Sequence, residues 1–262
     1  MALLIGVVHL PALPGSPRAR LGLDACLDWA RRDARALVDG GADGVIVENF
    51  HDAPFFAEEV PPITVAAMTA LCRDLRGDIP VEMGVNVLRN DAAAALAIAV
   101  ASGADFIRVN VHSGAMVTDQ GIISGRAAET LRLRRQLGAE RIRILADVLV
   151  KHAAPLGQQR IEDAVADAVE RGLADAVIVT GTATGAAASP EDVRRAATAT
   201  TAPVLVGSGI SADNVAAYVP PAAGVIVGSW LKVDGIVGNP VDVARVRALR
   251  ERLAIRGESG RV

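Results

Sequence analysis

Short aliphatic runs alternate with helical segments along the whole chain, and this alternation restricts the fold more than any other feature. Eight strands are predicted, at residues 3–8, 44–48, 81–87, 106–111, 142–148, 176–180, 204–206 and 224–227. A predicted helix follows each strand, at residues 24–39, 63–75, 91–102, 126–137, 161–171, 190–200, 212–218 and 241–253. Eight such pairs in 262 residues average about 33 residues each, the length of one strand–helix crossover unit. We therefore predict an α/β fold, a (β/α)8 TIM barrel that forms a single domain over residues 1–262.

An open, doubly wound sheet is the alternative arrangement of the same elements. That fold would place a glycine-rich dinucleotide-binding turn directly after the first strand. The chain instead has HLPALPG at residues 9–15. The composition, 51% hydrophobic and only 3% aromatic, also suits parallel strands that are covered on both faces. The sequence therefore favours the barrel.

Charge and the N-terminal sequence exclude several classes of function. The net charge of −3 is not that of a nucleic-acid-binding protein. The first apolar run has no basic residue before it, is broken by Pro11 and Pro14, and is too short to span a bilayer. We interpret it as a strand, and expect a cytoplasmic protein with no transmembrane segment, in which any membrane association is peripheral. A homo-oligomer is also expected, although no particular surface in the sequence requires it.

All four histidines follow predicted strands. In a parallel barrel the carboxyl ends of the strands open onto one face, so residues distant in sequence meet at one mouth. Imidazoles titrate near neutral pH, and their gathering at one mouth predicts a chemical site. The catalytic candidates there are Glu48, Asp147, His112, His9, Lys151 and His152. The substrate-binding candidates are Asn86, Asn110, His51, Thr180, Gly181 and Thr182.

The fourth predicted strand indicates which side chains face inward. Phe106, Arg108, Asn110 and His112 alternate with aliphatic residues that must face the outer helices. Glu82 has an inward position on the preceding strand by the same reasoning. Because a barrel interior tolerates charge only when it is paired, we predict a buried ion pair between Glu82 and Arg108. A role of this pair in the site is the alternative.

Glycine–serine turns follow the last two predicted strands. Glycine lets the backbone approach an anion closely, and free N–H groups at a following helix can bind its oxygens. Loops after strands seven and eight are also where TIM barrels often bind phosphate. We therefore predict a small phosphorylated ligand held by Gly207, Ser208, Gly209, Gly228 and Ser229. The alternative is that these glycines only form tight turns.

A metal centre is a further alternative, because histidine and carboxylate side chains at separate strand ends can hold zinc or another divalent ion. However, the first strand has a single histidine rather than a His-x-His pair, and no aspartate ends the eighth strand. Both observations argue against the amidohydrolase pattern. We assign no metal ligand; the sequence requires no cofactor, and a divalent metal stays an open alternative.

Several motifs together resemble those of the BtpA family. They are GVVHLPALPG at residues 6–15, ENFHDAPF at 48–55, GVNVLRND at 84–91, RVNVHSGA at 108–115, DVLVKH at 147–152 and GSWLK at 228–232. The resemblance extends over nearly the whole chain. The family, which has SgcQ-like members, is grouped with the ribulose-phosphate-binding barrels. The resemblance implies that type of barrel, and it carries over no catalytic residue or reaction.

Two functions are compatible with these observations. The first is an enzyme (an isomerase, lyase or hydrolase) that acts by acid–base chemistry on a small phosphorylated metabolite, such as a phosphosugar or a nucleotide-sugar derivative. The second, which the family's name implies, is a non-catalytic factor that assembles or stabilises a membrane complex such as photosystem I. Phe55 and Phe56 would then contribute an exposed apolar patch for peripheral binding. A scaffold has no need of clustered ionisable groups, so the sequence favours the enzyme.

Overall fold

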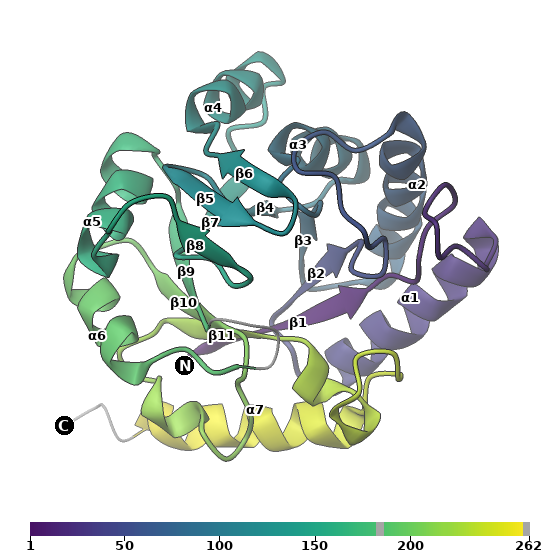
Figure 1. Cartoon of the computed structure of the whole chain (residues 1–262). Helices are drawn as coiled ribbons and strands as arrows, with labels where there is room; N and C mark the ends of the chain where they lie inside the picture. The colour runs from purple at the N-terminus through teal and green to yellow at the C-terminus, as the bar shows by residue number, and fades with distance from the viewer. Residues whose placement is uncertain (182–185, 259–262) are drawn as a thin grey trace.

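Eight parallel strands close into a barrel in a computed structural model that describes residues 1–181 and 186–258 (Figure 1). Around the barrel the strands follow the order β1-β11-β10-β9-β7-β4-β3-β2. Their bounds are β1 Leu3–His9, β2 Gly44–Glu48, β3 Glu82–Asn86, β4 Phe106–Val109, β7 Arg143–Val148, β9 Ala176–Thr180, β10 Val204–Gly207 and β11 Gly224–Val227. The predicted TIM barrel is confirmed.

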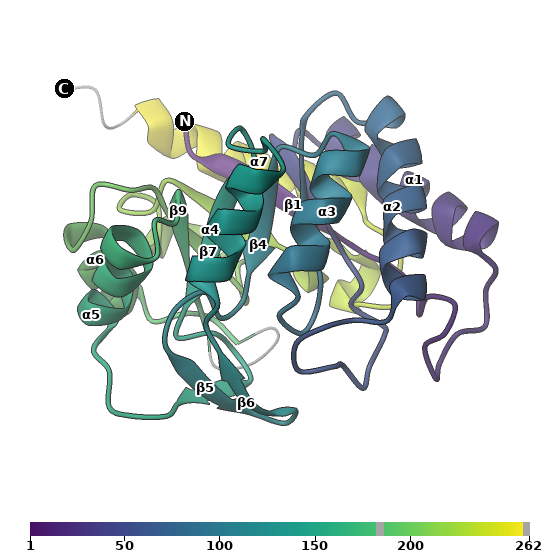
Figure 2. The ribbon, with the colours of Figure 1, turned by 90° about the horizontal axis from the view of Figure 1, so that it is seen from above.

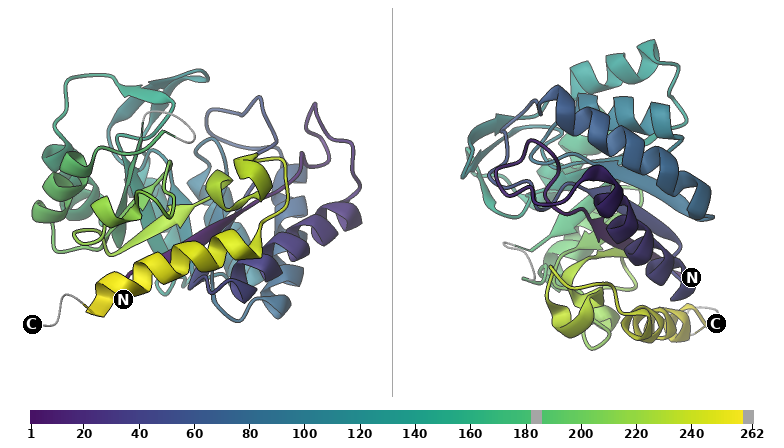
Figure 3. Two further views of the ribbon diagram at one scale, coloured as in Figure 1. Left: turned by 90° about the horizontal axis from the view of Figure 1, so that it is seen from below. Right: turned by 90° about the vertical axis from the view of Figure 1, so that its right-hand side faces the viewer.

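Helices surround the barrel and cover the outer faces of its strands (Figure 1). They are α1 Leu23–Asp39, α2 Pro62–Asp78, α3 Ala92–Ser102, α4 Ala127–Gln136, α5 Ile161–Ala166 with the π-helical turn Asp167–Arg171, α6 Pro190–Thr198 and α7 Val243–Glu258. Helix α7 packs beside α1 and so completes the ring (Figure 3). Aliphatic side chains between this ring and the strands form the larger hydrophobic core.

One predicted helix, at residues 212–218, is present only as the single 3-10 turn Val215–Ala217. The side chain of Asn214 accepts a hydrogen bond from the Ser211 N–H and so holds the chain in a tight turn. Two prolines follow at residues 220 and 221. Since proline cannot donate a helical hydrogen bond and disfavours helix in the residue before it, the segment cannot lengthen into a helix.

A small antiparallel sheet that the sequence did not predict lies beyond the carboxyl ends of the barrel strands. It has the order β6-β5-β8, with β5 Ala115–Thr118, β6 Gly121–Ser124 and β8 Ala153–Pro155. Its strands come from the loops after β4 and β7, and β5 and β6 project from that end of the barrel (Figure 2). These strands are too short to show a hydrophobic period.

A second, smaller core fills the inside of the barrel. It consists of Ile5, Val7, Ile46, Phe106, Leu145, Ala176, Ile178, Leu205 and Ile226. Phe106 is its largest member, and Gly84 on the neighbouring strand makes room for it. A Cβ atom added to Gly84 would lie 2.1 Å from Cε2 of Phe106. This plug of hydrocarbon closes the lower part of the barrel and leaves the polar residues above it.

The predicted ion pair between Glu82 and Arg108 is wrong. Glu82 is half-exposed and pairs with Arg143, with Oε1 2.6 Å from Nη2. The strand register explains the error: Gly84 lies opposite Phe106, so Glu82 lies four positions below the level of Arg108. At about 3.3 Å per residue this separates the two side chains by about 13 Å along the barrel.

Candidate functional site

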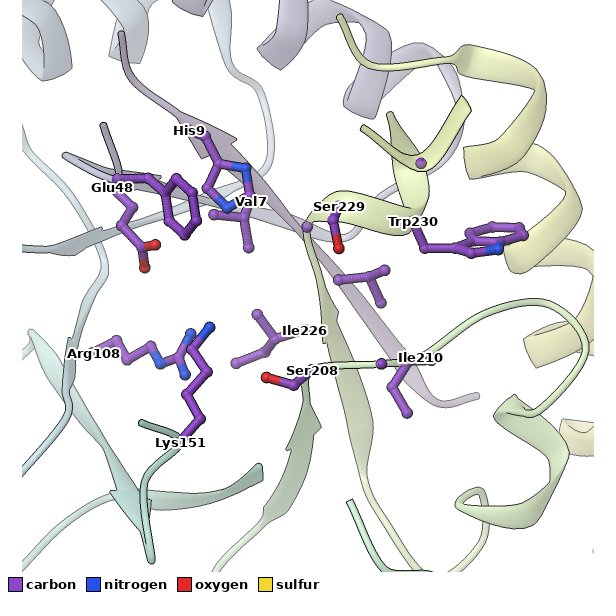
Figure 4. Close-up of a pocket in the computed structure, with 15 residues that line it drawn as sticks. Val7, His9, Glu48, Arg108, Lys151, Ser208, Ile210, Ile226, Ser229 and Trp230 are labelled. Atoms are coloured by element: carbon purple, nitrogen blue, oxygen red, sulfur yellow. The ribbon is translucent and has the colours of Figure 1, made fainter. Parts of the chain in front are cut away.

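A cavity of about 190 Å³ opens among the carboxyl ends of the barrel strands (Figure 4). Such a volume is many times what one water molecule needs, and it suits a small ligand. Seven of the residues predicted for the site border it: His9, Glu48, Lys151, Ser208, Gly209, Gly228 and Ser229. The groups that line it come from both ends of the sequence, because the barrel closes between β1 and β11.

Glu48 is held in place from two sides. It ends β2 and lies in register with His9 on β1 and with Asn86 on β3. The Nδ2 atom of Asn86 donates a hydrogen bond to Oε2 of Glu48, at 2.5 Å. Both side chains are buried. Asn86 therefore orients the carboxylate of Glu48 toward the cavity and does not itself line it.

His9 presents a neutral imidazole to the cavity. Burial, and next the charge of Lys232, lowers the pKa of His9 well below its ordinary value of 6.5. The ring packs against Phe50, with 4.4 Å between the ring centroids. Its Nδ1 atom is buried and has no hydrogen-bond partner among the described residues. At neutral pH the imidazole is therefore uncharged, the form in which it can accept a proton or a hydrogen bond.

Asp147 supports the cavity from below. Its carboxylate accepts hydrogen bonds from Nε and Nη2 of Arg108, both at 2.9 Å, and from Nδ2 of Asn110, at 2.8 Å. The side chains of Arg108 and Asp147 are 4% and 0% exposed, so this is a buried, bidentate ion pair. Arg108 borders the cavity and is held in position by Asp147, whose carboxylate Asn110 holds in turn.

Lys151 reaches the cavity from the loop after β7 (Figure 4). Its backbone N–H donates to Oγ1 of Thr180, at 3.0 Å, and its carbonyl accepts from Nη2 of Arg89, at 2.7 Å. Thr180, predicted as a substrate contact, is thus engaged in holding this loop. Burial, and next the charge of Arg108, lowers the pKa of the Lys151 ammonium below its ordinary value.

The two glycine–serine turns meet at the opposite side of the cavity. Ser208 has a φ of +71°, which is rare for a residue other than glycine, and its Oγ is buried without a hydrogen-bond partner among the described residues. Gly228 lies under His9, since an added Cβ would come within 2.7 Å of the His9 Cε1 atom. Gly207 ends β10, and an added Cβ there would lie 3.8 Å from Nη2 of Arg108.

Three of the four histidines lie outside this cavity. His112 points away, and its Nε2 lies 2.7 Å from the carbonyl oxygen of Gly172. The predicted inward position of His112 is wrong because β4 ends at Val109, and strand alternation does not continue beyond it. His51 lines a separate surface pocket, and His152 is exposed.

The loop after β9 contributes less than expected. A Cβ atom added to Gly181 would lie 2.1 Å from the carbonyl oxygen of Ala186, so Gly181 serves a close backbone approach. Thr182 lies outside the described residues.

Eight residues that line the cavity were not among the predicted site residues, and the three with large polar or aromatic side chains are Phe50, Arg108 and Trp230. The inward position of Arg108 on its strand was an available signal, but the predicted ion pair with Glu82 favoured a structural role over one at the cavity. Phe50 and Trp230 stand next to predicted residues within recognisable motifs, and nothing local distinguishes them from core aromatics.

Within residues 1–181 and 186–258, no group of three or more His, Cys, Asp or Glu side chains is arranged so that it could hold a metal ion. Nor does any helix in those ranges combine the length and the apolar character needed to cross a lipid bilayer.

Comparison with known sequences shows the family. The model of the BtpA family matches residues 2–254. The chain is 50% identical over 252 residues to the photosystem I biogenesis protein BtpA of Synechocystis sp., covering 96% of this chain and 88% of that protein. The chain therefore belongs to the BtpA family, as its motifs indicated.

Comparison with solved structures shows the same fold. Thiamine phosphate pyrophosphorylase from Pyrococcus furiosus has a TM-score of 0.61 at 14% identity, with 97% of this chain and 96% of that one covered. N-(5'-phosphoribosyl)anthranilate isomerase from Pyrococcus furiosus has a TM-score of 0.59 at 13% identity, with 97% and 100% covered. At this level of identity the likeness concerns the barrel alone.

Proposed function

We propose that this BtpA-family chain is an enzyme that binds a small phosphorylated metabolite in the cavity at the carboxyl ends of its strands. One observation carries the proposal. Two glycine–serine turns, after β10 and β11, face the same cavity as His9, Glu48 and Lys151. Anion-binding turns and proton-transfer groups that share one cavity suit a substrate with a phosphate at one end and a reacting centre at the other.

The turns have the features expected of a phosphate subsite. The unpartnered hydroxyl of Ser208 is a hydrogen-bond donor without an acceptor among the described residues. Burying a polar group without a partner costs free energy, so a ligand that supplies an acceptor there gains affinity. Gly209, with a φ of +62°, lets the backbone turn closely past this point. Several structural neighbours are named for phosphorylated compounds, which agrees with this subsite.

Glu48 and His9 are the groups that we propose to move protons. They lie on adjacent strands in register, and both border the cavity. Asn86 fixes the orientation of the Glu48 carboxylate, and burial keeps His9 uncharged. Positioned acid–base groups of this kind contribute about 10²–10⁴-fold to a rate. Isomerisation, lyase chemistry and hydrolysis all use such a pair, and we extend the proposal to this range of reactions.

Binding of inorganic phosphate, measured by titration calorimetry, tests the proposal. The variant Ser208→Ala removes one charge-assisted hydrogen bond to phosphate, and we expect about a 10-fold loss of affinity. The protein should keep its stability, because the Ser208 hydroxyl makes no hydrogen bond within the described residues. Ser102→Ala is the matched control: its hydroxyl on α3 is also buried and unpartnered there, and it does not line the cavity.

The phosphate affinities of the wild-type protein and the two variants decide for or against the proposed subsite. Phosphate binding that weakens in Ser208→Ala and is unchanged in Ser102→Ala supports the proposed subsite. An absence of phosphate binding in the wild-type chain, or equal affinities in all three proteins, would overturn it.

A peripheral role at a membrane complex is the second candidate function. It is favoured by the name of the Synechocystis relative and by Phe56, whose side chain is 56% exposed beside a surface pocket that Phe55 also lines. Flotation with lipid vesicles tests it: Phe56→Ser should release the protein from the membrane under this function and change nothing under the enzymatic one. The cytoplasmic location and the homo-oligomeric state are further proposals, which cell fractionation and analytical ultracentrifugation measure.

A further inference from the structure

Lysine is nearly absent from this chain. Of its 27 lysine and arginine residues, only Lys151 and Lys232 are lysines. Lys232 is fully buried, and its Nζ lies 2.5 Å from Oδ2 of Asp33 on α1. Its amine is therefore occupied in an ion pair and closed to solvent. Lys151 is left as the one lysine amine that borders the cavity.

Hydrogen bonds and an unusual backbone conformation fix the position of Lys151. Hydrogen bonds from Arg89 and to Thr180 hold its backbone on both sides. The neighbouring residues Leu149 and His152 have φ angles of +51° and +56°, which are unfavourable for side chains with a Cβ. Backbone strain of this kind clusters at functional sites, where it aims a side chain. Here the strained loop directs the Lys151 side chain into the cavity (Figure 4).

Among the described residues, the amine of Lys151 has no ion-pair partner. None of the carboxylates in the described residues lies within 4.0 Å of its Nζ. Two carboxylates lie near enough to act on its charge: Glu48 borders the same cavity, and Asp147 is already paired with the guanidinium of Arg108. A lysine that is partly buried and placed beside another cation is pushed toward its neutral form, the form that acts as a nucleophile.

An arginine at position 151 could not act as a nucleophile. A guanidinium binds anions as well as an ammonium does, and it stays charged at every physiological pH. The chain uses arginine for nearly all of its cationic contacts, so a lysine at the cavity points to a need for a primary amine rather than for a charge. Amines differ from guanidinium groups in that they condense with carbonyl compounds.

We propose that Lys151 forms a covalent imine with the carbonyl carbon of a phosphorylated aldehyde or ketone. The nitrogen lone pair adds to the carbonyl carbon, and the carbonyl oxygen takes up a proton to give a carbinolamine. Loss of that hydroxyl group as water leaves the imine, so amine and carbonyl are converted into imine and water without any oxidant or reductant. Hydrolysis reverses the step and restores the amine.

This proposal rests on the proposed function and narrows it to carbonyl substrates. A protonated imine withdraws electrons from the adjacent carbon, so a C–H or C–C bond there can break with the electron pair passing into an enamine. Glu48 and His9, which border the same cavity, are placed to exchange the proton (Figure 4). Isomerisation and aldol-type cleavage fit this chemistry, whereas simple hydrolysis has no use for it.

Reductive trapping tests the proposal on the full chain. The protein is incubated with dihydroxyacetone phosphate and sodium borohydride, which reduces an imine to a stable secondary amine, and peptides are then mapped by mass spectrometry. We expect a single lysine adduct, on Lys151, with unlabelled Lys232 as an internal control. Dihydroxyacetone, which lacks the phosphate, should give at least 10-fold less adduct, because a lost hydrogen-bonded phosphate costs at least that factor in affinity.

The variant Lys151→Arg separates a nucleophile from a simple anion-binding cation. It keeps the positive charge and should retain phosphate binding, but it should show no adduct on this loop. Phosphate binding without any adduct in the wild-type protein would overturn the imine and leave the proposed function standing. Equal adduct from both ketones, without phosphate binding, would support the reactive amine and overturn the phosphate subsite. Adduct confined to the N-terminal amine would also reject the proposal.

Discussion

Replacing Asp147 by asparagine should destabilise the protein strongly, although the two side chains are nearly equal in size. The substitution keeps the shape of the side chain and removes its charge, which leaves the Arg108 guanidinium without its counter-ion. The two side chains are 4% and 0% exposed and are joined by two hydrogen bonds of 2.9 Å. Breaking a buried ion pair by removing one partner costs about 3–5 kcal/mol. Since Arg108 also borders a cavity that water can enter, we expect the lower end, about 3 kcal/mol, or more than 100-fold in the folding equilibrium.

Urea unfolding followed by circular dichroism measures this loss, and the barrel contains its own control. Glu82 pairs with Arg143 at 2.6 Å, but the two side chains are 49% and 43% exposed. An exposed pair of this kind contributes at most about 1 kcal/mol, so Glu82→Gln should cost no more than that. If Asp147→Asn and Glu82→Gln lower the free energy of unfolding equally, burial is not what gives the Arg108 pair its importance.

Three further predictions concern stability. Burial lowers the pKa of His9 below 6.5, so below that pH the unfolded chain binds a proton that the folded chain does not. The free energy of unfolding should therefore fall as the pH is lowered below 6.5, by up to about 1.4 kcal/mol per pH unit for this one group, and urea titrations of His9→Gln should show a shallower fall. His112→Ala loses a buried contact to a backbone carbonyl and should lower the free energy of unfolding, measured in urea, by about 2 kcal/mol. Calorimetry should find the affinity for phosphate unchanged, and a loss of affinity would contradict the position of His112 outside the cavity. Gly84→Ala would press a Cβ atom against Phe106 and should lower the free energy of unfolding by about 2 kcal/mol, seen as a lower thermal midpoint. Gly77→Ala should cause no such loss, because beyond its own helix backbone and chain neighbours no atom lies within 4 Å of the added Cβ.

The sequence by itself determined the barrel and predicted the end of it at which the candidate site lies. Strand–helix alternation with a repeat of about 33 residues leaves few alternatives to a closed parallel sheet. All carboxyl ends of such a sheet open on one face, so the positions of His9, Glu48 and Lys151 at one cavity followed from local pattern alone. The glycine–serine turns after the last two barrel strands likewise predicted that Gly209 and Gly228 lie beside them.

Tertiary structure alone decided which charges pair and which side chains turn away. Alternation along a strand tells the face on which Arg108 lies, but the register between strands sets its height, and this register selected Asp147 rather than Glu82 as its partner. The direction of His112 depended on where β4 ends, which a short apolar run does not specify. In the antiparallel sheet, β5 and β6 form a local hairpin, but β5 also pairs with β8 from a loop far away in sequence, and such a contact has no local signature. Local patterns record the neighbours along the chain, whereas the chemistry of a cavity depends on neighbours that meet only when the barrel closes.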